Sequence, residues 1–257
     1  MLLSVIIPVY NERKTLGQIL SVVSHATPLV PKEIIVVDDC STDGTREWLN
    51  ANFPDGPRTG TTLDLDSTGN ILLVEAADSP RITIRPAYHE RNRGKGGALQ
   101  TGFALFTGDI LVIQDADLEY DPNDWTQMYD LIAVRKVADV VYGSRFYGRP
   151  HRSLYFHHYL ANRLISLLFN IMFNQTLTDI ETCYKMMTRL VAKSLRLEAN
   201  DFGIEIEMST EIARQRSLRI YELGITYYGR TYNEGKKINW RDGLKAIWYL
   251  FKFRLMR

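Results

Sequence analysis

Four carboxylates follow a short apolar run near the middle of the chain. Residues 111–113, "LVI", are typical of a buried strand, and the next nine residues, "QDADLEYDP", carry Asp115, Asp117, Glu119 and Asp121. The first three acids alternate, so on an extended chain they point to the same side. Carboxylates this close repel one another and need a cation. Their oxygens suit Mg²⁺ or Mn²⁺, so these three acids are candidate metal ligands. Asp121 is expected to cap the helix that follows.

Polar clusters also follow two other apolar runs. The segments are "PVYNE" (8–12) and "DDCSTDG" (38–44), which join "QDADLE" (114–119). In open α/β sheets, ligands bind where the strands end at their carboxyl edge. Three polar strand ends in one chain therefore predict a binding edge.

A basic, glycine-rich segment, "ERNRGKGGAL" (90–99), leads into a predicted helix. Backbone amides at a helix start, with Arg91, Arg93 and Lys95 nearby, suit a phosphate group. The segment is not a Walker A motif, and no GxGxxG follows the first strand. These absences disfavour P-loop and dinucleotide-binding enzymes.

The elements that must position these residues alternate along the chain. The consecutive apolar residues 34–37 indicate strands buried on both faces, as in a parallel sheet. Strands are expected at 4–10, 33–39, 81–86, 109–117, 138–146 and near 219–227. Helices are expected at 13–24, from an N-cap at Ser41 or Thr42, at 94–106, at 154–173 and near 205–216. Residues 53–80 are rich in Gly, Pro, Asp and Thr, and they predict a surface insertion with a small, partly mobile hairpin.

Composition narrows the class of protein. The 257 residues are 45% hydrophobic and 24% charged, as in a globular protein, and the net charge of +1 gives no reason to expect nucleic acid. Cys40 and Cys183 are expected to be reduced thiols. The first ten residues lack the basic region of a signal peptide, and no apolar run approaches the roughly 20 residues that span a bilayer.

Six motifs, in this order, resemble family 2 glycosyltransferases with the GT-A fold. They are "SVIIPVYNE", "VVDDCSTDGT", "RNRGKGGALQTGF", "QDADLEYDP", "VVYGSRF" and "LTDIETCYKMM". Within that family they are similar to the dolichyl-phosphate mannose and glucose synthase branch, over residues 4–49 and 82–237. The resemblance implies an α/β fold with a mostly parallel sheet flanked by helices. It also implies nucleotide binding in the first half and acceptor binding in the second.

The resemblance implies a nucleotide-sugar site with a metal. Asp117 and Glu119 match the metal-binding end of the family's DAD-x-Q motif, where Glu119 replaces the usual Gln. A carboxylate there can still ligate a metal, but the change weakens any inference about the donor. The expected metal ligands are Asp115, Asp117 and Glu119. The expected nucleotide-sugar contacts, with Lys95 added from the glycine-rich segment, are Pro8, Tyr10, Glu12, Val37, Asp39, Lys95, Asp115, Ala116, Arg230 and Lys236.

The acceptor side is placed in the same way. Arg145 matches a residue that faces the acceptor phosphate. A second acceptor-side Arg of the family falls at Asn162, where Arg163 or Arg152 is the expected substitute. Asp179 matches an acid near the reaction centre, or else it caps a helix. The expected catalytic residues are Asp117, Arg145, Asp179 and Arg230.

The acceptor decides whether a base is needed. A sugar hydroxyl must lose a proton, whereas a lipid phosphate is already ionised and needs positioning, which Arg supplies. Arg145 therefore favours a lipid phosphate. Together with the resemblance, which implies an inverting, metal-dependent reaction, this predicts transfer of a hexose from a UDP- or GDP-sugar to a polyprenyl phosphate. Two alternatives remain: a saccharide acceptor, and a nucleotide-sugar-binding protein without turnover.

The tail is basic and amphipathic. Residues 229–257 carry eight basic and two acidic residues. An apolar helical face is formed by Trp240, Leu244, Ile247, Trp248, Phe251 and Leu255, beside Arg241, Lys245 and Lys252. Such a helix suits an anionic membrane surface, or it packs on its own domain or on a partner.

The sequence thus divides into a catalytic domain at 1–229 and a peripheral segment at 230–257. Membrane contact is expected through 154–173 and 240–257, on the cytoplasmic face. The alternative for the first segment is that its face of Leu160, Leu164, Leu167, Leu168 and Ile171 is plain core. The oligomeric state is left unassigned.

Overall fold

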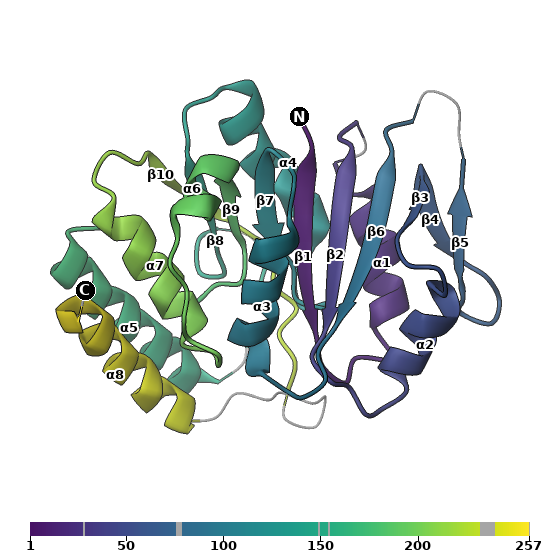
Figure 1. The fold of residues 1–257 in the computed structure, drawn as a ribbon. Helices are drawn as coiled ribbons and strands as arrows, with labels where there is room; N and C mark the ends of the chain where they lie inside the picture. The colour runs from purple at the N-terminus through teal and green to yellow at the C-terminus, as the bar shows by residue number, and fades with distance from the viewer. Residues whose placement is uncertain (28, 76–78, 149, 154, 232–239, 257) are drawn as a thin grey trace.

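A mixed eight-stranded sheet forms the centre of the molecule (Figure 1). The computed structural model describes residues 1–27, 29–75, 79–148, 150–153, 155–231 and 240–256. The strand order is β10-β8-β9-β7-β1-β2-β6-β3. The strands are β1 (Leu3–Val9), β2 (Lys32–Asp38), β3 (Arg58–Gly60), β6 (Ile82–Tyr88), β7 (Ile110–Ile113), β8 (Val140–Ser144), β9 (Lys185–Thr188) and β10 (Ile220–Gly224). Only β3 and β9 pair antiparallel with their described neighbours, so the predicted, mostly parallel sheet is confirmed.

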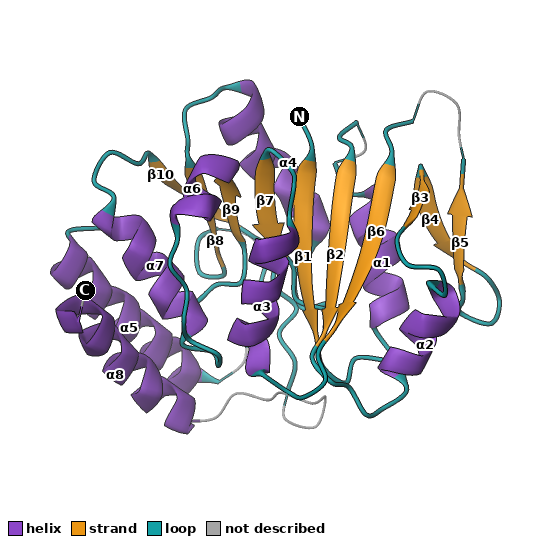
Figure 2. Cartoon of the chain, viewed as in Figure 1, coloured by secondary structure: helices purple, strands orange, loops and turns teal. Residues whose placement is uncertain are grey.

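Helices cover both faces of the sheet (Figure 2). They are α1 (Leu16–His25), α2 (Thr45–Asn52), α3 (Gly94–Leu105), α4 (Trp125–Tyr129), α5 (Phe156–Phe173), α6 (Arg189–Ser194), α7 (Ile204–Arg214) and α8 (Trp240–Met256). A 3₁₀ turn, η1 (Pro122–Asp124), and a π-helical turn, η2 (Asp130–Val134), flank α4. In η1, the Asp121 side chain accepts the Asn123 N–H, which confirms the predicted cap. Because the central strands are covered on both faces, β2 is buried along its whole length.

The second helix begins later than predicted. It starts at Thr45, because the Asp43 carboxylate accepts the Thr45 N–H at 3.0 Å and Gly44 turns with φ +92°. Ser41, one of the two predicted caps, instead accepts a hydrogen bond from the Asn11 N–H at 2.9 Å. Ser41 therefore joins the loops that follow β1 and β2.

The segment 53–80 contributes to the main sheet and to the core as well as to the surface. It contains the predicted hairpin, β4 (Thr62–Leu65) with β5 (Ile71–Val74), and it also supplies β3, the edge strand of the main sheet. Leu63 is fully buried, and the Trp48 indole donates to Gly69 O at 3.0 Å. The hairpin is thereby packed into the core beside α1 and α2.

The helices α5, α7 and α8 lie together at one end of the molecule (Figure 1). α8 packs against its neighbours through Ala246, Leu250 and Phe253, which are buried. Of the apolar face predicted for it, Trp248, Phe251 and Leu255 are exposed and Ile247 is half-buried. The side chains of Trp240, Arg241 and Leu244 lie outside the described residues.

α5 also turns apolar residues outward. The alternative that its predicted face is core is wrong, because α5 is buried through Ile165, Ser166 and Phe169 instead. Four of the five residues of that face are exposed, namely Leu160, Leu164, Leu167 and Ile171. None of the described helices has the length and apolar character needed to cross a membrane.

The close packing of α3 on β1 can be tested at one glycine. A Cβ at Gly102 would lie 2.3 Å from Ile6 Cγ2, so we expect Gly102→Ala to lower the free energy of unfolding. The overpacking penalty less the helix-propensity gain is about 1–2 kcal/mol. Gly243→Ala is the control: it meets nothing within 4 Å and should leave the stability unchanged or raise it. Equal losses in urea denaturation of both variants would contradict this packing.

Candidate active site

One cavity of about 880 Å³ opens at the carboxyl edge of the sheet. It is lined by the loops after β1, β2 and β7, by the start of α3, and by parts of α5, α7 and α8. Most of the predicted site residues line it, namely Pro8, Tyr10, Glu12, Asp39, Lys95, Asp115, Ala116, Asp117, Glu119, Arg145 and Arg230. Val37, Asp179 and Arg163 do not line it, and Lys236 lies outside the described residues.

The acidic side chains after β7 come together because the chain turns there. They do not alternate along an extended strand. β7 ends at Ile113, and Leu118 takes φ +62°, which no extended strand permits. The Glu119 N–H donates to Asp117 Oδ1 at 3.2 Å within this turn. The expectation of an extended acidic segment is therefore wrong, although Asp117 and Glu119 still meet.

The positively charged Arg230 side chain forms ion pairs with these acids. Its guanidinium lies 2.9 Å from Asp117 Oδ2, 3.0 Å from Glu119 Oε1 and 3.6 Å from Glu12 Oε1. The Arg230 N–H also donates to Glu119 at 3.0 Å, and the Tyr227 hydroxyl donates to Glu119 at 2.6 Å. The segment 227–230, which follows β10, is therefore bonded to the acidic turn that follows β7.

Asp115 has a different cation. Lys95 Nζ lies 2.8 Å from Asp115 and 3.1 Å from Glu205, and Glu205 is also paired with the buried Lys185 at 2.6 Å. Burial lowers the pKa of Lys95, but the charges of Asp115 and Glu205 outweigh it and hold that pKa well above its ordinary value. Among the described residues, no three His, Cys, Asp or Glu side chains come together as a metal-binding group. Of the predicted ligands, Asp117 and Glu119 thus share Arg230, whereas Asp115 is paired with Lys95.

Asp39 holds the start of α3. Its carboxylate accepts the N–H groups of Arg93 and Gly94 at 2.8 and 2.7 Å, and it pairs with His89 Nδ1 at 2.7 Å. The Gly96 N–H donates to Asn200 O at 2.8 Å. The backbone amides of Arg93, Gly94 and Gly96 therefore already have partners within the protein, and a phosphate site at this helix start stays a prediction.

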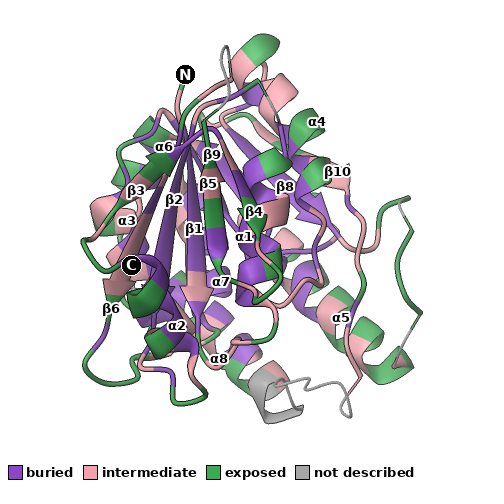
Figure 3. Ribbon diagram, turned by 90° about the vertical axis from the view of Figure 1, so that its right-hand side faces the viewer, coloured by how far each residue is buried: buried purple, intermediate pink, exposed green. Residues whose placement is uncertain are grey.

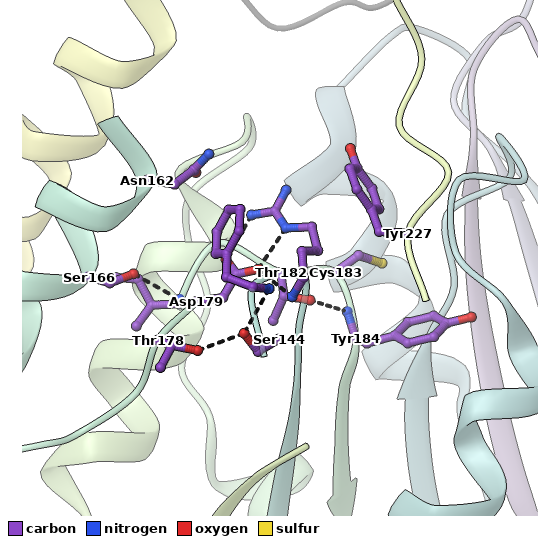
Figure 4. Close-up of polar contacts among 12 residues, drawn as sticks. Ser144, Asn162, Ser166, Thr178, Asp179, Thr182, Cys183, Tyr184 and Tyr227 are labelled. Carbon is purple, nitrogen blue, oxygen red and sulfur yellow. Dashed lines mark hydrogen bonds and ion pairs between the residues drawn. The ribbon is translucent and has the colours of Figure 1, made fainter. Parts of the chain in front are cut away.

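Arg145 is held in place by Asp179, which is labelled in Figure 4. The guanidinium Nε and Nη2 each lie 2.7 Å from one Asp179 oxygen, and the Arg145 N–H adds a third bond at 3.1 Å. Asp179 is fully buried, so its carboxylate orients Arg145 from behind and faces no ligand. The alternative that Asp179 caps a helix is wrong, because its oxygens are occupied by Arg145.

The second predicted acceptor arginine is not in the cavity. Arg163 Nη1 lies 3.5 Å from Thr178 O, and Arg152 Nη1 lies 3.2 Å from Gly229 O. Neither residue lines the cavity, whereas Asn162 does (Figure 4). The sequence reasoning also missed Glu181, Glu205 and Tyr227, which line the cavity. The motif "LTDIETCYKMM" contained Glu181, but no pattern singled it out.

Comparison with known proteins identifies the class. Residues 4–59 and 66–196 match the model of glycosyl transferase family 2, so the chain belongs to this family and is a glycosyltransferase. It is 29% identical over 241 residues to the undecaprenyl-phosphate mannosyltransferase of Micrococcus luteus, covering 90% of this chain and 85% of that protein. It is 26% identical over 239 residues to the undecaprenyl-phosphate 4-deoxy-4-formamido-L-arabinose transferase of Yersinia enterocolitica, covering 92% of this chain but 64% of that one.

A solved structure supports the fold. Glucosyl-3-phosphoglycerate synthase from Mycobacterium tuberculosis, in complex with Mn²⁺, UDP and glucosyl-3-phosphoglycerate, superposes with a TM-score of 0.66. The match covers 98% of this chain and 79% of that one at 19% identity. The chain therefore has the predicted GT-A-like architecture, and its motifs and relatives agree on the polyprenyl-phosphate sugar transferase branch.

The crowded acids predict a pH effect on the ligand-free protein. Burial, Asp115 and Glu119 raise the pKa of Asp117 from 3.8 to about 7, against the opposing charge of Arg230. The folded state therefore holds this proton more tightly than the unfolded state, and stability should fall as the pH rises from 3.8 to about 7. Thermal unfolding across that range should show the fall, and Asp117→Asn should reduce its slope. An unchanged slope in the variant would contradict the assignment.

Proposed function

We propose that the protein transfers a hexose from a nucleotide diphosphate sugar to a polyprenyl phosphate at a membrane surface, with a divalent metal ion. The observation that carries this is one cavity that contains both an acidic pair and a buried, oriented arginine, Arg145. The names of the undecaprenyl-phosphate relatives support the acceptor class, and the UDP bound in the similar solved structure supports the donor class.

The donor belongs on the side of the strand ends. Asp117 and Glu119 present hard oxygen ligands around a place that already accommodates a cation, the Arg230 guanidinium, so they fit Mg²⁺ or Mn²⁺. When bound, the metal stabilises negative charge on the leaving diphosphate. Arg230, which bridges these two acids in the structure, would then be available to the diphosphate, where charge develops as the bond to the sugar breaks.

The acceptor belongs at Arg145. A phosphate monoester is ionised at neutral pH, so it needs orientation and not a base. Asp179 holds the Arg145 guanidinium in place, which leaves the remaining N–H groups to bind phosphate oxygens. The acceptor oxygen attacks the anomeric carbon while the diphosphate leaves, which inverts that centre in one displacement.

The lipid chain has an apolar surface next to the cavity. Ile165 of α5 and Ala246 of α8 line the cavity, and both helices carry exposed apolar residues. Figure 3 shows the exposed stretches of α5. The exposed apolar residues are Phe156, Leu160, Leu164, Leu167 and Ile171 on α5, and Trp248, Phe251 and Leu255 on α8. With the basic residues Lys245 and Lys252, they suit the interface of an anionic membrane.

The test is nucleotide release from a panel of UDP- and GDP-sugars with Mn²⁺ or Mg²⁺. Each donor is incubated with a short-chain polyprenyl phosphate, with the matching polyprenol, or with free saccharides. Release should require the phosphorylated lipid and one donor, and Arg145→Ala should abolish it. Equal release with the polyprenol or with a saccharide would overturn the lipid-phosphate acceptor.

The membrane surface is tested separately by flotation with anionic vesicles. The double variant Leu167→Asp/Trp248→Asp should lose vesicle binding, because it removes one apolar residue from each helix and adds negative charge. Leu29→Asp, at a leucine that is 88% exposed and lies between α1 and β2, is the control and should bind as the wild type does. Equal flotation of all three proteins would contradict the proposed surface.

A further inference from the structure

Glu181 is a carboxyl group in the cavity that the transfer reaction above does not use. It lies in the connection between α5 and β9, and its largely buried side chain lines the cavity. The nearby charged residues already form ion pairs: Asp179 pairs with Arg145, and Lys185 pairs with Glu205. Among the described residues, none donates a hydrogen bond to the Glu181 side chain. Its carboxyl group lines the cavity, where a bound ligand can reach it.

The charges around Glu181 indicate which part of a substrate it faces. Burial raises its pKa to about 7, with Arg145 and Lys185 opposing the shift. Of the other charges that act on it, Glu205 is joined through Lys95 to Asp115, on the donor side. Arg145 lies on the proposed acceptor side. The chain segment that carries Glu181 is tied to Arg145 through Asp179 and to Glu205 through Lys185, so Glu181 lies between the two halves of the cavity.

Electrostatics excludes the anionic parts of both substrates. Under the proposed function, on which this inference rests, the donor brings a diphosphate and the acceptor brings a phosphate. A carboxylate repels both, most strongly where water is excluded. The neutral group that lies between them during transfer is the hexose, whose hydroxyl groups can donate hydrogen bonds to a carboxylate.

We propose that Glu181 binds hydroxyl groups of the transferred hexose and thereby helps to determine which sugar the enzyme accepts. Its two carboxylate oxygens can accept hydrogen bonds from two neighbouring hydroxyls. A site built to hydrogen-bond a hydroxyl rejects an analogue that lacks it, because the buried polar group is then left unpaired. Glu181 would then select among hexoses that share one nucleotide.

The inference is tested by binding, without an acceptor. Calorimetry measures the affinity of the free nucleotide diphosphate and of the matching nucleotide sugar, with Mn²⁺, for the wild type, Glu181→Ala and Glu181→Gln. We expect Glu181→Ala to weaken the nucleotide sugar by about 10- to 100-fold, the effect of losing a hydrogen bond to a charged group. Affinity for the free diphosphate should stay unchanged, because that ligand lacks the hexose.

Controls separate a sugar contact from a structural role. Glu47→Ala, an exposed acid on α2, should bind both ligands as the wild type does. Deoxy-sugar donors that lack the contacted hydroxyl should lose affinity for the wild type but not for Glu181→Ala. Glu181→Gln preserves the shape of the side chain. It is measured in place of Glu181→Ala if that variant does not fold.

Two results would overturn the inference. In one, the Glu181 variants bind the nucleotide sugar as tightly as the wild type. In the other, they lose affinity for the sugar and the free diphosphate equally. Because no lipid is used, failure of polyprenyl phosphate as an acceptor would count against the proposed function without affecting this result.

Discussion

The mutual repulsion of carboxylates at the edge of the sheet is the constraint on which the site depends. Asp117, Glu119 and Glu12 come from two different strand ends, and they lie close together because the Arg230 guanidinium is among them. This cation comes from beyond β10, more than a hundred residues away in the chain. The ion cluster thereby holds the segment after β10 against the carboxyl edge of the sheet.

The other ion pairs of the cavity join its two halves in the same manner. Lys95 of α3 is held between Asp115 and Glu205, which belongs to α7. Arg145, directly after β8, is held by the buried Asp179. Because α7 packs on α8, the helix with the exposed apolar residues is linked by direct packing to the side of the cavity that carries Lys95 and Asp115. Ionic contacts inside the cavity and apolar packing outside it therefore hold the proposed donor and acceptor sites in one arrangement.

Local patterns predicted much of this architecture. The apolar runs located most strands, and the polar clusters after β1, β2 and β7 marked the binding edge. What sequence reasoning missed depends on contacts between distant residues. One example is β9, which lies antiparallel between β7 and β8. Another is the turn at Leu118, which brings the acidic side chains together. The sequence predicted that α8 is amphipathic. Which of its faces is buried depends on packing against α5 and α7, which the sequence pattern of α8 does not contain.

We propose that Arg230 compensates the charge of the acids until a metal ion takes that place, and that Arg230 then serves the diphosphate. Electron paramagnetic resonance of Mn²⁺ measures this directly in the wild type and in Arg230→Gln, with and without UDP. Without nucleotide, the variant should bind Mn²⁺ more tightly than the wild type, because the competing cation is gone. With UDP, the variant should lose that advantage, because the diphosphate has lost its arginine. Equal or weaker Mn²⁺ binding by the variant without nucleotide would contradict the account.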